Sequence, residues 1–421
     1  MNISNPTLVL LLGGISALSA SASADVFNPR FAVTEIHSRA GANTSSPFAA
    51  AAVMGMQGYS NTPVIPGWES TLTVICSVST GSSQWPSACN PAGMASTMAS
   101  FSATSWVAAS FLNSDQASAL AEIVTAVQAF GSPALVPAFG LADHWFSVNQ
   151  ITATLASGVW TIAQVRLFDG GPLGQTDSGF NEYEAGTLIL GGSVWRNIYF
   201  RPISLINPSC DQVGCTSDPY YNRYVVVFDP PVGQTAPPIA VSFTRSPGVL
   251  GTGERAMSPA LAQARVWSSL TAAAVDRDAD LWRSLRAGAA GAALEVNAVG
   301  PSGTRWDYYL VPILTSPHSD TAIGFVQLAT DDGSLDALRV PTASEPFVPV
   351  TEARAEQVAA SVLAAGETLG AGILTWDSRA NTGFVKSPTK PYYEFPILDA
   401  RGRSAGVVRV PLVVAKPVRG S

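Results

Sequence analysis

The sequence Ala134-Leu-Val-Pro-Ala-Phe139 is followed closely by His144-Trp-Phe-Ser-Val148 and then by Trp160-Thr-Ile-Ala-Gln-Val-Arg-Leu-Phe-Asp-Gly170. All three runs are rich in apolar, β-branched and aromatic residues, which favour strands. A His opens the second run and an Asp stands near the end of the third. These strands can therefore bring an imidazole and a carboxylate together on one sheet.

A helix is predicted immediately before these strands. Residues 117–130 place Leu120, Ile123, Val124 and Val127 on one helical face, and Gly131-Ser-Pro133 ends the pattern. A helix followed by consecutive strands is typical of the α+β class, which we predict for this chain.

This order resembles the papain-like cysteine peptidases of the C39-like bacterial branch. In that family a helix ending in a Gly-x-Pro step precedes a strand that begins near His, and a second strand ends in Asp or Asn. The resemblance covers residues 35–200. It implies a papain-like fold in which His144 is the general base and Asp169 orients it.

The nucleophile position departs from the family pattern. The family places its Cys at a helix start, in a segment of the type Asn-Trp-Cys-Trp-Ala-Ala, and the matching stretch here is Ser45-Ser-Pro-Phe-Ala-Ala50. Pro47 thus occupies the Cys position, and Cys89-Asn-Pro91 matches a second family segment 42 residues later. Proline suits the first turn of a helix but carries no nucleophile. The resemblance therefore implies a degenerate peptidase that binds a peptide or protein.

Two other nucleophiles remain open. Ser46 is adjacent to Pro47, but the Gln expected in the oxyanion hole is absent from residues 38–46. Cys89 begins a Cys-Asn-Pro-Ala segment that is similar to the Cys-Gly-Pro-Ala of other C39-like members. The alternative to a degenerate peptidase is therefore an active cysteine peptidase using Cys89, His144 and Asp169. A third hypothesis is a structural extracellular or envelope protein.

The first 24 residues read as a signal peptide. Leu8–Leu12 form an apolar core and Ala20-Ser-Ala-Ser-Ala24 supplies a small-residue cleavage site, although no Lys or Arg precedes the core. We therefore predict a secreted or periplasmic protein whose mature chain starts near Asp25.

Export to an oxidising compartment favours disulfides. Three connectivities are possible for four cysteines, and we predict the two that are closest in sequence, Cys76–Cys89 and Cys210–Cys215. If both form, the mature chain has no free thiol.

Charge and composition change near residue 230. Residues 25–245 hold 13 acidic residues, 7 Arg and no Lys, whereas the rest of the chain holds 17 acidic and 16 basic residues. Stretches rich in Pro and Gly lie between these halves. We predict a papain-like domain at 25–230, a linker at 231–257 and two α+β repeats at 258–342 and 343–421.

The two repeats share a short motif. Tyr308-Tyr-Leu-Val-Pro-Ile313 recurs as Tyr392-Tyr-Glu-Phe-Pro-Ile397, an offset of 84 residues. Each copy follows a predicted helix, one beginning at Ser258-Pro259 and one covering 352–365, and each precedes an apolar β run. This resembles cystatin-like or PepSY-like modules, with a helix on an antiparallel sheet. We predict that the paired tyrosines and Trp306 belong to the core, and that His318 lies in a solvated loop.

Composition excludes other classes. The net charge is −7 and the chain has no basic run, which argues against a nucleic-acid partner. With 47% hydrophobic and 13% charged residues it is not disordered, and no run after the leader reaches the roughly 18 apolar residues of a membrane helix. No zinc spacing and no phosphate-binding loop is present. We predict no metal and no cofactor.

Overall fold

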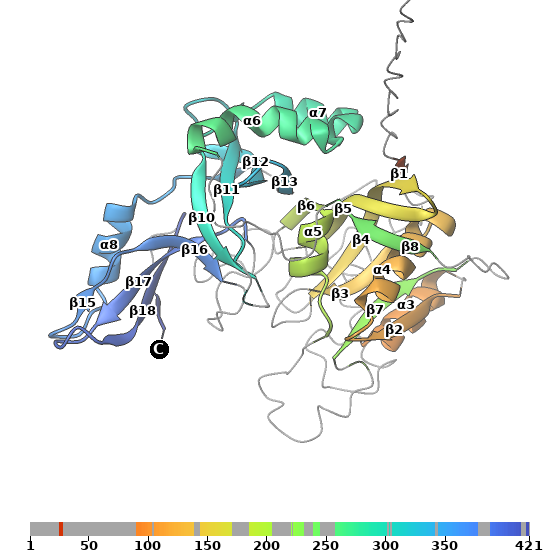
Figure 1. Ribbon diagram of the computed structural model, residues 1–421, viewed down its shortest axis with the longest axis horizontal. Coiled ribbons are helices and arrows are strands. Elements are labelled where there is room, and N and C mark those ends of the chain that lie inside the picture. Colours follow the sequence, from red (N-terminus) through yellow and green to blue (C-terminus); the bar gives the residue numbers. More distant parts are fainter. Residues whose placement is uncertain are drawn as a thin grey trace, which may run out of the picture.

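The computed structural model describes residues 25–27, 90–102, 105–138, 144–170, 185–203, 220, 222–230, 239–244, 257–300, 303, 305–341, 344–377, 388–413 and 418–420 (Figure 1). These residues form helices and a large mixed sheet, in agreement with the predicted α+β class.

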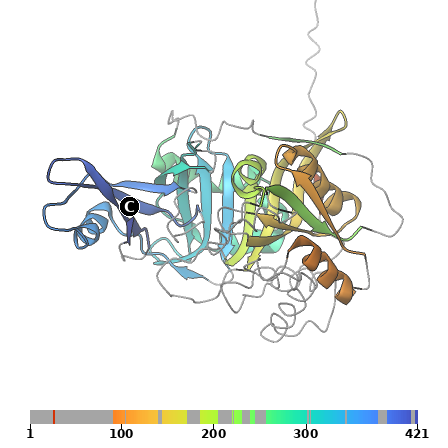
Figure 2. The same cartoon turned by 90° about the horizontal axis from the view of Figure 1, so that it is seen from below.

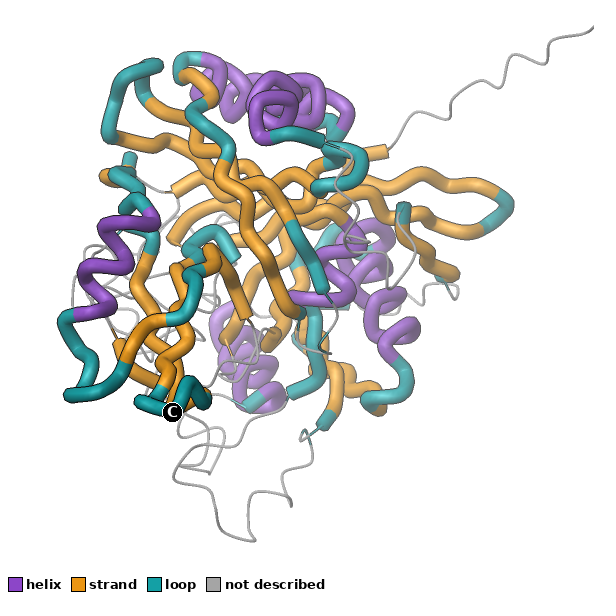
Figure 3. Tube along the Cα trace, turned by 60° about the vertical axis from the view of Figure 1, so that its left-hand side comes forward, coloured by secondary structure: helices purple, strands orange, loops and turns teal. Residues whose placement is uncertain are grey.

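The helices are short and lie around the sheet rather than between its strands (Figure 3). They are α3 (Pro91–Ser102), α4 (Gln116–Val124), α5 (Gly192–Val194), α6 (Pro259–Ala272), α7 (Ala279–Arg286) and α8 (Glu352–Ala360). The π-helical turns η1 (Thr125–Ala129) and η2 (Trp195–Tyr199) continue α4 and α5, and the 3-10 turn η4 (Val275–Arg277) precedes α7.

The first half of the chain forms one end of the sheet. Its strands are β1 (Asp25–Phe27), β2 (Val107–Leu112), β3 (Ala134–Ala138), β4 (His144–Ala156), β5 (Val159–Gly170), β6 (Ala185–Gly191), β7 (Arg223–Phe228) and β8 (Ala240–Phe243). The order β2–β7–β3–β4–β5–β6 is antiparallel throughout. β1 adds to the edge of β4, and β8 pairs in parallel with β5.

The second half continues this sheet. Its strands are β9 (Ala289–Ala290), β10 (Leu294–Val299), β11 (Tyr308–Leu314), β12 (Thr321–Ala329), β13 (Leu335–Pro341), β14 (Glu345–Pro346), β15 (Thr368–Leu369), β16 (Ile373–Asp377), β17 (Tyr392–Leu398), β18 (Ser404–Pro411) and β19 (Val418–Gly420). β13 pairs antiparallel with β6, so a backbone ladder joins the two halves. β10 then pairs in parallel with β16, which leads to β17, β18 and β19. In Figure 2 the α6–β13 segment accordingly lies between the first half and the C-terminal strands.

The strands that carry the two Tyr-Tyr motifs have the same pairing pattern. β11 pairs with β9 and β10 on one side and with β12 on the other, and β17 pairs likewise with β15, β16 and β18. The register shifts at the same point in both, after Ile313 in β11 and after Ile397 in β17.

Matching faces of these strands pack against helices. Val311 and Ile313 of β11 share a core with Val266 and Leu270 of α6. The residues 84 positions later in β17, Phe395 and Ile397, share a core with Ala355 and Ala359 of α8. Tyr308, Tyr309, Tyr392 and Trp306 are buried, which confirms the prediction that they belong to the core, whereas Tyr393 is only half-buried.

Two details differ from the sequence prediction. α8 ends at Ala360 rather than near residue 365, because the Val362 and Leu363 N–H groups bond to carbonyls three residues back and so tighten the chain into a turn. Part of the predicted linker is the strand β8, which pairs with β5 from Val159 to Ile162. The helix predicted at Ser258-Pro259 is confirmed as α6, with the Ser258 side chain accepting from the Leu261 N–H.

Candidate functional site

The predicted base and its orienting residue lie on neighbouring strands. His144 is the first residue of β4 and pairs with Ala138 of β3, whereas Asp169 lies next to the end of β5 and pairs with Gly186 of β6. β4 and β5 are antiparallel, with Ser147 opposite Phe168. His144 is three positions before Ser147 and Asp169 is one position after Phe168, so the backbone brings both to the same end of the sheet.

Helix α4 and its continuation η1 support these strands. Leu120, Ile123 and Val124 of α4 are fully buried and share one core with Phe146 and Val148 of β4. Asp115 begins α4 by accepting a hydrogen bond from the Ser118 N–H. The predicted amphipathic face is therefore confirmed, and it holds the strand that His144 opens.

The chain turns from η1 into β3 at Gly131, which has φ 61°. A residue with a β-carbon rarely adopts this conformation, which accounts for the glycine. Next to it, the buried Ser132 hydroxyl accepts from the Asp229 N–H at 3.0 Å. This bond connects the start of β3 to the end of β7.

The position of the lost nucleophile and all predicted disulfide partners lie outside the described residues. These are Pro47, Cys76, Cys89, Cys210 and Cys215. The description begins again at Asn90, directly after Cys89. The Asn90 side chain accepts from the Gly93 N–H at 2.8 Å and its carbonyl accepts from the Met94 N–H at 2.8 Å, so Asn90 caps α3.

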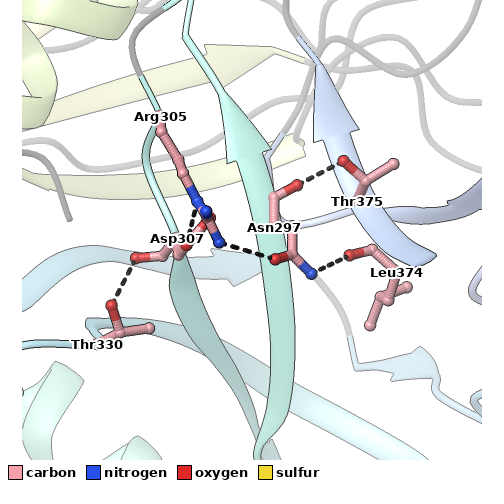
Figure 4. Close-up of polar contacts among 6 residues, drawn as sticks. All are labelled: Asn297, Arg305, Asp307, Thr330, Leu374 and Thr375. Atoms are coloured by element: carbon pink, nitrogen blue, oxygen red, sulfur yellow. Dashed lines mark hydrogen bonds and ion pairs between the residues drawn. The ribbon is translucent and has the colours of Figure 1, made fainter. Parts of the chain in front are cut away.

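The sequence did not reveal a polar network at the junction of β10 and β16 (Figure 4). Arg305 Nε donates to Asp307 Oδ2 at 2.6 Å, and its Nη2 donates to Asn297 Oδ1 at 3.4 Å. Asn297 in turn donates to the Leu374 carbonyl at 3.4 Å, and its own carbonyl accepts from the Thr375 hydroxyl. The network thus connects the two segments that carry the Tyr-Tyr motifs.

The Asp307 carboxylate is deeply buried in this network. Its side chain is 3% exposed, and Oδ1 has no hydrogen-bond partner within the part of the chain that the structure describes. The neighbouring Trp306 donates from Nε1 to Asp336 Oδ2 at 3.0 Å. The one sign of this cluster in the sequence was that the charged Asp307 stands directly before the apolar strand β11.

Tyr392 lies at the other end of the β10–β16 junction, beside the last residue of β16. Its hydroxyl accepts from the Asp377 N–H at 3.3 Å. Burial raises the pKa of this phenol to about 12, with Arg409 acting in the opposite direction. Tyr392 is therefore a neutral structural group at physiological pH.

Within the part of the chain that the structure describes, no group of three or more His, Cys, Asp or Glu side chains could hold a metal ion. None of the described helices is long and apolar enough to span a membrane. His318 lies exposed in a turn between β11 and β12, as predicted.

Comparisons with protein-family models, with curated proteins and with solved structures found no match.

Proposed function

We propose that the first half is a papain-like domain that has lost its nucleophile and binds a peptide or protein beside His144. One observation carries this proposal: the β4–β5 register, which brings His144 and Asp169 to the same end of two neighbouring strands. A catalytic His needs a carboxylate or amide beside it to fix its tautomer and orientation. Because β4 begins where the antiparallel β5 ends, the backbone can supply Asp169 as the carboxylate beside His144.

The order of elements supports the same proposal. Helix α4 precedes β3, β4 and β5, and its buried face packs against the strand that begins with His144. With Pro47 in the nucleophile position, such a site could bind an extended chain but form no acyl-enzyme. Binding without cleavage is the expected activity.

Peptide binding and cleavage can be measured on the same preparation. The mature protein is incubated with fluorescein-labelled casein for cleavage and with an array of immobilised 12-residue peptides for binding. We expect no cleavage, and binding that weakens at least tenfold in His144→Ala but not in the matched control His318→Ala. Cleavage by the wild type, or binding unchanged in His144→Ala, would contradict the proposal.

A second candidate function is peptide cleavage by Cys89 with His144 and Asp169. It is favoured by the position of Cys89 directly before the Asn90 cap of α3. A helix N-terminus stabilises a thiolate and so activates a Cys. This function requires casein cleavage that Cys89→Ser abolishes.

We further propose that the chain is exported and that its second half contains two copies of one module. The predicted mature N-terminus, Asp25, is the first residue of β1, so the first described strand begins where the predicted leader ends. The module proposal is supported by the matched registers of β11 and β17.

A further inference from the structure

Three polar atoms on β4 and β5 are buried and have no hydrogen-bond partner among the described residues: Ser147 Oγ, Asn149 Oδ1 and Arg166 Nε. Ser147 is 0% exposed and Asn149 is 4% exposed. Burying such atoms unpaired costs about 1–3 kcal/mol each. We propose that these three residues form a binding site for an amide group of a small ligand.

The three residues share one face of the sheet. Ser147 and Asn149 alternate along β4 with Phe146 and Val148, which belong to the core under α4. Arg166 likewise alternates along β5 with the core residues Val165 and Leu167. Side chains alternate between the two faces of a strand, which places Ser147 and Arg166 on the face away from α4. Asn149, the extra residue of a β-bulge, stands with Gln150 opposite Arg166 and so belongs to the same face.

A β-bulge sets Asn149 and Gln150 opposite Arg166 in the β4–β5 ladder. The β4–β5 register shifts between Val148 and Gln150, which leaves Asn149 as the extra residue. Arg166 pairs with Gln150, the residue directly after Asn149. Bulges redirect side chains and are frequent beside functional sites.

The second half of the chain borders this face. Gln164 donates to the Ala273 carbonyl, and Arg166 Nη1 donates to Asp278 Oδ2 at 2.6 Å. The connection between α6 and α7 therefore lies over Gln164 and Arg166 of β5. A ligand bound here would contact the joint between the two halves of the chain.

The available atoms select the ligand chemistry. Arg166 Nε–H and the Ser147 hydroxyl can donate to one carbonyl oxygen, and Asn149 Oδ1 can accept one N–H. Asp278 already neutralises the Arg166 charge, so a second carboxylate would gain little there. A neutral amide, with one carbonyl and one N–H, matches all three atoms. This site is independent of the function proposed above, because it uses neither His144 nor Asp169.

Acetamide is the simplest probe. Its binding is followed by NMR through the Arg166 Nε–H and Asn149 side-chain amide resonances of the full mature chain, with acetate titrated in parallel. We expect saturable shifts with acetamide and at least tenfold weaker binding of acetate.

Ser147→Ala separates binding from folding. This change removes an unpaired buried hydroxyl, so the variant should be as stable as the wild type or more stable, yet bind acetamide at least tenfold more weakly. Ser110→Ala, at an exposed position of β2, is the matched control and should bind normally. Three results would each overturn the proposal. They are saturation by acetate alone, unchanged acetamide binding in Ser147→Ala, and no saturation by either probe, which would show that an ordered water alone fills the site.

Discussion

Asp278 connects the two halves of the chain, and its replacement gives a quantitative prediction. Its Oδ2 accepts from Arg166 Nη1 at 2.6 Å, and its Oδ1 accepts from the Leu281 N–H at 3.0 Å, which caps α7. The two side chains of the ion pair are 19% and 32% exposed. Asp278→Asn keeps a good helix cap but removes the charge.

The expected cost follows from these two contacts. A hydrogen bond to a charged group contributes about 1.5–3 kcal/mol. Because solvent reaches both side chains, we expect the lower end, about 1.5 kcal/mol, for Asp278→Asn. Asp278→Ala also loses the cap and should cost about 1 kcal/mol more. A double-mutant cycle with Arg166→Met should return a coupling of about 1.5 kcal/mol.

The pH dependence of this cost has a defined sign. Burial raises the pKa of the Asp278 carboxyl, but the Leu281 N–H and the Arg166 guanidinium outweigh it, and the net pKa is lowered. A lowered pKa gives stability that is present above the unfolded value of about 3.9 and is lost as the pH falls through the folded value. The difference between wild type and Asp278→Asn should therefore stay constant from pH 7 down to near the unfolded value of about 3.9 and shrink as the pH falls below it.

Urea unfolding followed by tryptophan fluorescence measures these differences. Asp280→Asn is the matched control, because Asp280 and its partner Arg283 are 90% and 76% exposed and such pairs contribute little. An effect of Asp278→Asn as small as that of the control, with no coupling to Arg166, would refute the contact between α7 and β5.

Two further predictions concern the second half. Glu345→Gln removes the carboxylate that binds the buried Arg339 guanidinium at 2.8 Å, and it should lower the free energy of unfolding in urea by about 3 kcal/mol. The control Glu356→Gln, at an exposed position, should change it by almost nothing. Equal changes in the two variants would contradict the buried ion pair. Tyr392 has a pKa raised to about 12 by burial, so its contribution to stability is present below the unfolded value of about 10 and is lost as the pH rises. Ultraviolet titration should show one phenol fewer ionising near pH 12 in Tyr392→Phe; loss of a phenol titrating near pH 10 instead would show that Tyr392 is not buried.

Local patterns in the sequence predicted elements in both halves of the chain. The face of α4, the strands β3, β4 and β5 and the cap of α6 follow from apolar spacing and from Ser258-Pro259. The same patterns overestimated the length of α8, because its final turn tightens through contacts that spacing does not encode.

The junctions between segments could not be predicted from local patterns. The pairing of β6 with β13 joins residues about 150 positions apart, and nothing in either strand specifies the other. The buried charges of Asp307 and Arg339 depend on partners brought by the fold, so composition alone marks them as surface residues. The same distinction holds for the candidate sites. His144 and Asp169 were predicted from local patterns, whereas the site at Ser147, Asn149 and Arg166 could be found only from the β-bulge and from the burial of these side chains in the fold.

We propose that the site beside His144 kept its base and lost its thiol. The most direct test is iodoacetamide labelling of the native mature protein without reductant, with adducts located by mass spectrometry. If both predicted disulfides form, the native chain gives no adduct, and all four cysteines give adducts only after reduction and unfolding. A single adduct that forms rapidly at Cys89 of the native protein, while casein cleavage is lost in parallel, would contradict this proposal.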